Sequence, residues 1–153
     1  MSIDTLVILV HIFFGTAFLF TMIVTQLVIK DIMGLFPESE KKESAKKIMG
    51  RRIRGSMDAT IIIMTITALY FLHSRLDLLF ASNILFVKAL VGGSALLIAL
   101  FLHFVLRPIK VRAIASGNKN RMMVLNKLAP RLERTAMFFA FITVLLAIYF
   151  NHG

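Results

Sequence analysis

The chain has 153 residues, of which 58% are hydrophobic, and its mean hydropathy of +0.83 is far above that of an ordinary soluble domain. It contains no cysteine, which excludes disulfides, thiolate metal sites, iron–sulfur clusters and covalently attached c-type haem. The formal net charge of +10 is gathered between the apolar segments, as membrane insertion requires, so we expect no nucleic-acid partner.

The first apolar segment, residues 5–29, is uncharged apart from the single titratable group of His11. A helix of this length crosses a hydrocarbon core of about 30 Å with some tilt. The residues before it lack the basic start of a signal peptide, and the apolar run is too long for one. We therefore expect a first membrane helix that is retained in the protein.

Three further apolar segments follow, at residues 59–74, 84–106 and 135–150. The second is short, so we expect it to recruit flanking residues or to thin the bilayer locally. Continuous hydrophobicity without alternation favours helices over barrel strands. We predict an all-α integral membrane four-helix bundle, one domain over residues 1–153, with helices at about 4–30, 57–75, 83–107 and 132–151. No internal repeat is evident in the sequence.

Basic residues set the expected orientation. Residues 30–57 and 107–134 each hold eight of the 18 lysines and arginines, whereas Arg75 alone lies in the intervening loop. Both basic loops are therefore expected to be cytoplasmic, with both termini outside, in a multi-pass protein of a bacterial cytoplasmic (inner) membrane. A basic helix between Pro37 and Arg54 is expected to lie on anionic lipid. A homo-oligomer or a larger membrane complex is also compatible with this layout.

His11 is the leading functional candidate. It lies roughly 10 Å from the outer end of the first helix, at a depth where a titratable group is costly and therefore indicates a functional site. Gly15 is one turn below it, and Met22 continues the same face. An imidazole above a glycine favours a haem lying against the helix. The alternative is close helix packing, with His11 hydrogen-bonded to a neighbouring carbonyl or hydroxyl.

Other polar residues could complete such a site. Lys88 enters the third helix with Gly92 one turn below, and it could neutralise a porphyrin propionate or only extend its amine to the interface. His103, near the other end of that helix, could be a second ligand or an interface residue. His73 and His152 lie at the outer ends of the second and fourth helices.

A metal site is an alternative. Imidazole and thioether ligands suit copper as well as haem iron, so His11, Met22 and His73 are the candidate copper ligands. The threonine hydroxyls of the second helix are expected to bond to their own helix or to a neighbour; these are Thr60, Thr65 and Thr67.

Four short motifs carry a resemblance to a known group of proteins: Leu9-Val10-His11-Ile12, Lys46-Lys47-Ile48-Met49-Gly50-Arg51-Arg52-Ile53, Phe86-Val87-Lys88-Ala89-Leu90 with the later His103, and Asn126-Lys127-Leu128-Ala129-Pro130. Together they resemble the four-helix membrane proteins around HemJ-type protoporphyrinogen oxidase and the CopD-type copper-resistance domain. The resemblance implies possible haem b binding with His11 as axial ligand.

Three functions are therefore open. The first is a haem b-associated membrane redox protein, possibly a porphyrinogen- or quinone-linked oxidoreductase, with haem held from the first helix. The second is a copper-handling CopD-like protein. The third is a non-catalytic subunit or assembly factor whose basic loops dock on a partner. The sequence contains no phosphate loop, carboxylate pair or Ser–His–Asp pattern, so it assigns no catalytic residue and leaves enzymatic activity undecided.

Overall fold

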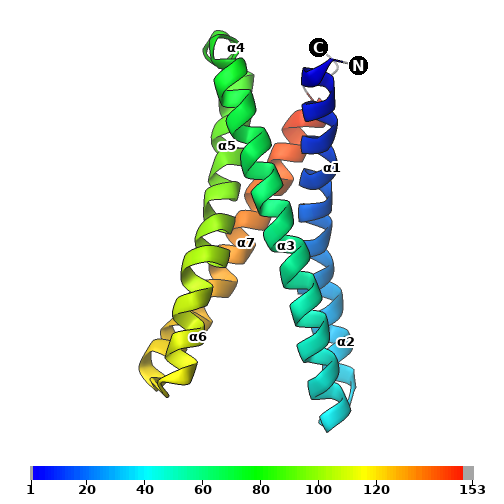
Figure 1. Ribbon diagram of the computed structural model, residues 1–153, viewed down its shortest axis with the longest axis vertical. Coiled ribbons are helices and arrows are strands. Elements are labelled where there is room, and N and C mark those ends of the chain that lie inside the picture. Colours follow the sequence, from blue (N-terminus) through cyan, green and yellow to red (C-terminus); the bar gives the residue numbers. More distant parts are fainter. Residues whose placement is uncertain (1, 150–153) are drawn as a thin grey trace. The chain divides into compact units, whose positions relative to one another are not determined.

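The computed structural model describes residues 2–149, apart from the side chains of Gln26, Leu27, Lys30 and Leu78. This part of the chain is helical throughout, with short connections and no strands (Figure 1). Four helices are long and apolar enough to cross a membrane: Ile3–Ile23, Glu40–Ser74, Asn83–Ala115 and Lys119–Tyr149. The predicted all-α chain with four candidate spans is thereby confirmed, whereas its orientation stays a prediction. The chain divides into two compact units, Met1–Thr67 and Ala68–Gly153, and each is described by itself.

The first unit is a helical hairpin. Helix α1 (Ile3–Ile23) begins where the Ser2 hydroxyl accepts a hydrogen bond from the Thr5 amide. It passes through the π-helical segment η1 (Val24–Ile29) into α2 (Lys30–Leu35) without an intervening loop. A short extended connection then leads into α3 (Glu40–Ser74), which runs back alongside α1 (Figure 1).

The second unit starts with a short helix, α4 (Leu76–Ala81), followed by α5 (Asn83–Leu100), η2 (Phe101–Leu106) and α6 (Arg107–Ala115). A tight turn at Gly117, where φ is +64°, leads into the antiparallel helix α7 (Lys119–Tyr149). Glycine suits this turn because it adopts positive φ without steric cost. The buried core of the unit lies where η2, α6 and α7 meet, and it consists of Leu102, Leu106, Ala113 and Leu125.

The helices extend well beyond the predicted spans. Helix α3 starts at Glu40 rather than near residue 57, and α7 starts at Lys119 rather than near residue 132, with Pro130 inside it. Lysine, arginine and glutamate are good helix formers, and Glu40 and Glu43 favour the positive end of the α3 dipole. The basic segment of α3 is therefore a continuation of the spanning helix, not a separate helix that could lie flat on the membrane.

The two hairpins share an internal register that the sequence did not reveal. One constant shift in residue number maps η1 (Val24–Ile29) onto η2 (Phe101–Leu106), and the same shift maps His11 onto Lys88. The same shift pairs two glycines, Gly15 with Gly92. It also pairs residues that are buried in their own units, Phe18 with Ala95 and Met22 with Ala99. Few of the paired residues are identical, which is why the correspondence is not evident from the sequence alone.

Candidate functional site

The site with the most defined geometry in the first unit joins His11 of α1 to Thr67 of α3. The His11 Nδ1 atom lies 2.7 Å from Thr67 Oγ1, and the pair is partly buried. Thr67 itself is 6% exposed. A histidine at membrane depth thus has a specific polar partner, as the high cost of an unsatisfied polar group in lipid requires.

The hydrogen bonds of Thr67 favour one tautomer of His11. The Thr67 hydroxyl lies within donating distance of two backbone carbonyls of its own helix, at 3.0 Å from Ile63 O and 3.1 Å from Met64 O. When its hydrogen is directed to either carbonyl, the hydroxyl oxygen accepts from His11 and Nδ1–H is the donor. In this tautomer the lone pair of the imidazole is on Nε2. A donor on Nδ1 and a lone pair on Nε2 are the arrangement found in metal-ligating histidines.

The position beside Gly15, one turn below His11, is occupied by Met64. A Cβ built at Gly15 would lie 3.4 Å from Met64 Cε and 3.6 Å from Met64 Sδ. Gly15 therefore allows α3 to pack closely against α1. This contact and the Thr67 partner match the close-packing alternative that the sequence left open, so any haem would have to approach His11 from another direction.

The proposed copper ligands do not converge in the described part of the chain. Met22 is buried on the same face of α1 as His11 but lies three turns further along, roughly 16 Å by helical rise. Ligands of one ion lie only about 2.0–2.6 Å from it, so these two side chains cannot share a metal. His73 is exposed in the last turn of α3, and no group of three described histidines or carboxylates is close enough to hold a metal ion.

The second unit has a comparable arrangement with a different polar group. Lys88 is half-buried on α5, one turn from Gly92. A Cβ at Gly92 would lie 3.2 Å from Thr143 Cγ2 of α7, so this glycine also serves close helix contact.

His103 lies in the π-helical segment η2 of the same unit, where it is half-buried. It is separated from Lys88 by about 22 Å of helical rise, so these two residues mark opposite ends of one span. π-Helical segments are often found at functional sites, which keeps His103 a candidate. His152 lies outside the described residues.

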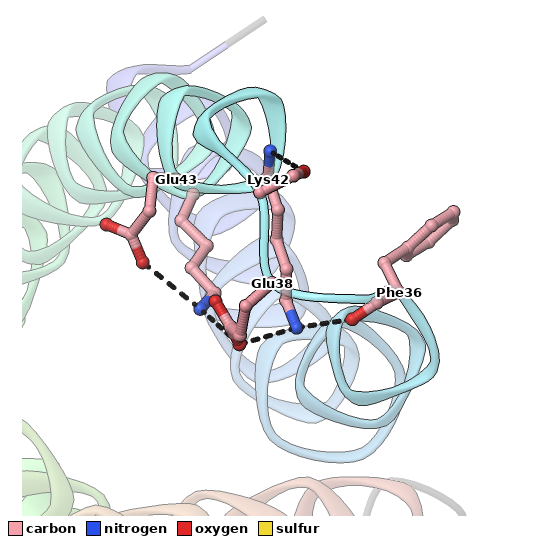
Figure 2. A network of polar contacts seen from close by, with 6 residues as sticks. Phe36, Glu38, Lys42 and Glu43 are labelled. Atoms are coloured by element: carbon pink, nitrogen blue, oxygen red, sulfur yellow. Dashed lines mark hydrogen bonds and ion pairs between the residues drawn. The ribbon is translucent and has the colours of Figure 1, made fainter.

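The tip of the first hairpin carries a network of charges (Figure 2). Lys42 Nζ lies 2.7 Å from Glu38 Oε1 and also donates to the Phe36 carbonyl, and its side chain is only 8% exposed. Lys46 bridges Glu38 and Glu43 at 3.5 Å each. The hydrogen bond from Lys42, with the positive charges of Lys42 and Lys46, holds the pKa of Glu38 below its usual value. These ion pairs stabilise the connection into α3, and in them the charges of Lys42 and Lys46 are balanced by those of Glu38 and Glu43.

Sequence reasoning had anticipated a hydroxyl partner for His11 without identifying it. The notable signal was the run of threonines on the second span, but periodicity alone does not give the relative rotation of α1 and α3. Comparison with known proteins adds no guide: no family model matches the chain, and no curated protein or solved structure is significantly similar to it. A functional conclusion therefore depends on the geometry around His11 and on the resemblance of the short motifs.

Proposed function

We propose that this chain is a membrane-embedded haem b protein with a redox function, in which His11 is an axial ligand. The observation that supports this most directly is the hydrogen bond from His11 Nδ1 to Thr67 Oγ1 at 2.7 Å. With Nδ1 as the donor, the lone pair is on Nε2, the nitrogen through which a histidine ligates haem iron when Nδ1 donates to the protein. The donor chemistry of His11 therefore fits the group, and the closed space at Gly15 limits the side from which it could bind.

The residues of the chain would hold and tune the cofactor. Thr67 orients the imidazole and favours one tautomer, because the α3 backbone carbonyls compete for its own hydrogen. The apolar side chains of the helices would exclude water from the iron-ligating nitrogen of His11. When bound, haem supplies one-electron redox chemistry, with which porphyrinogen or quinol oxidation is compatible.

Lys88 and His103 have subsidiary roles in this proposal. A lysine amine is suited to a propionate carboxylate, whereas the imidazole of His103, at the other end of the same span, is suited to a separate ligand or to a substrate carbonyl there. Lys88→Arg should then preserve more haem than Lys88→Ala, since the positive charge is retained. Equal loss in the two variants would argue against a role for the charge of Lys88.

An absorption spectrum tests the proposal. Protein purified in a neutral detergent from haem-replete cells should show haem b bands in the reduced-minus-oxidised spectrum, and His11→Ala should remove them. His73→Ala is the matched control, because it removes an exposed histidine from the end of α3 and should leave the bands unchanged. A colourless wild-type preparation, or a His11→Ala variant with full haem content, would refute the assignment.

A further inference from the structure

A hollow on the basic half of α3 forms a charged site within the first unit. It is lined by residues on one face of the helix: Glu43, Ser44, Lys46, Lys47, Gly50 and Arg54. Gly50 creates the depression because it has no side chain, and the Arg54 guanidinium lies along it, 3.8 Å from where a Cβ would be. The guanidinium therefore lies alongside the helix at Gly50, and Arg54 remains exposed to a ligand.

The hollow has a cationic end and a neutralised end. Glu43 and Lys46, at one end, are paired with each other at 3.5 Å. Arg54 lies at the other end and Lys47 lies between, one turn from Glu43; neither has an ion pair among the residues that the structure describes. The net charge available to a ligand is therefore positive and is concentrated between Lys47 and Arg54.

The continuity of α3 fixes the depth of this hollow. A span needs about 20 residues to cross the hydrocarbon, and counting back from Ser74, where α3 ends, places the hydrocarbon boundary near Gly55. Arg54 then lies at that boundary. Lys47 lies two turns further out, roughly 10 Å, just beyond a headgroup layer of about 5–8 Å, so that its long side chain would reach back into that layer.

We propose that this hollow binds the phosphate headgroup of an anionic phospholipid, with Lys47 and Arg54 as its two cationic contacts. A guanidinium donates to two phosphate oxygens at once, and a lysine adds a flexible point charge. The site is an element of the membrane-proximal helix and is independent of haem binding. Basic segments are generally attracted to anionic lipid. In this site the headgroup would in addition bind at one position, through contacts with named residues.

A binding titration tests this site. The full chain in neutral detergent is titrated against tail-labelled phosphatidylglycerol, and the Kd is measured by fluorescence anisotropy. The double variant Lys47→Ala/Arg54→Ala should weaken binding on the order of 30-fold, from the usual contribution of two basic residues near a lipid surface. The control is Lys41→Ala/Arg52→Ala, which removes the same charge from the other side of the same helix. That control should change the Kd by less than about threefold.

A third variant, Gly50→Leu, fills the hollow without changing any charge and should also weaken binding. Phosphatidylcholine should compete poorly, and inorganic phosphate at millimolar concentration should not compete, because the site is expected to require a membrane-anchored headgroup. Equal loss in the two double variants would overturn the proposal in favour of diffuse charge attraction. Unchanged binding in Gly50→Leu, or a wild-type chain without preference for phosphatidylglycerol, would overturn it too.

Discussion

His11 and Thr67 form a hydrogen bond between α1 and α3, with 2.7 Å between Nδ1 and Oγ1. The α3 backbone carbonyls compete for the only hydrogen of the Thr67 hydroxyl, which favours Nδ1–H as the donor. A single hydroxyl therefore favours Nε2 of this partly buried imidazole as the nitrogen that could act as a ligand.

Thr67→Val should remove this control without changing side-chain shape. We expect a 10- to 100-fold loss of haem affinity, as is typical for partners of metal-ligating histidines, and a higher reduction potential because the imidazole becomes a weaker donor. Haem titration and a redox titration of the purified protein measure the two effects. Thr65→Val is the control, since Thr65 donates to Ile61 O in its own helix and is not the residue bonded to His11. A Thr67→Val protein with unchanged affinity and potential would remove Thr67 from the site.

The contact between Gly92 and Thr143 predicts a steric limit in the second unit. Gly92→Ala should be less stable than Gly93→Ala by about 1 kcal/mol, because its Cβ would lie 3.2 Å from Thr143 Cγ2 whereas nothing lies within 4 Å of a Cβ at Gly93. Thermal unfolding in detergent compares the two variants directly. Thr143→Ser, which removes the crowding methyl group, should restore the stability of Gly92→Ala. Without such a rescue, the steric explanation fails.

The ion pair of Glu38 predicts a response to acid at the hairpin tip. The pKa of Glu38 is lower in the folded protein than in the unfolded chain, chiefly through the hydrogen bond from Lys42. Its contribution to stability is therefore fully present above the usual pKa of a glutamate and is lost as the pH falls through the lowered value. Amide exchange at the start of α3, compared at pH 6 and pH 3 after correction for intrinsic rates, should show protection decreasing with acid.

Glu38→Gln should abolish most of this pH dependence, because an amide does not titrate in that range. Glu40→Gln is the control, since no ion pair of Glu40 occurs in the described part of the chain. If Glu38→Gln and the wild-type protein respond equally to acid, Glu38 is not the titrating group.

The core where η2 meets α6 and α7 predicts a sharp difference between neighbours. Leu106 is 5% exposed and belongs to that core, whereas Val105 is 44% exposed. Leu106→Ala should reduce the free energy of unfolding by about 2–4 kcal/mol, and Val105→Ala should change it by less than about 1 kcal/mol. Denaturant unfolding in a fixed detergent measures both. Similar losses of unfolding free energy in the two variants would show that Leu106 does not point into the core of this unit while Val105 points away from it.

Much of the fold follows from hydropathy. Four apolar runs, of which only the third contains a charged residue (Lys88), predict four helices because an isolated backbone in lipid must satisfy its own hydrogen bonds. The ends of α3 and α7 could not be predicted in this way, since the basic residues that leave the membrane are also good helix formers and carry the helix onward. The π-helical segments were also missed, because residues 24–29 and 101–106 have the same apolar composition as the α-helix before them.

The candidate site was predicted less completely than the fold. His11 was selected by its cost in lipid, but Thr67 could be identified only once the rotation of α3 about its axis was known. Gly15 gave a misleading signal, because a glycine beside a polar residue equally well indicates a ligand cavity or close helix packing. The contact of Met64 with Gly15 shows that this glycine serves close helix packing. The sequence of α1 alone does not identify Met64 as its neighbour.

The common register of the two hairpins has an evolutionary consequence. A hairpin returns to the side of the membrane from which it starts, so copying it in tandem leaves the orientation of both copies unchanged. The paired π-helical segments and the paired Gly15 and Gly92 are what such a gene duplication would leave behind. Under such a duplication His11 and Lys88 would occupy equivalent positions of the two hairpins, so each unit would present a different polar side chain at the same level of its first spanning helix.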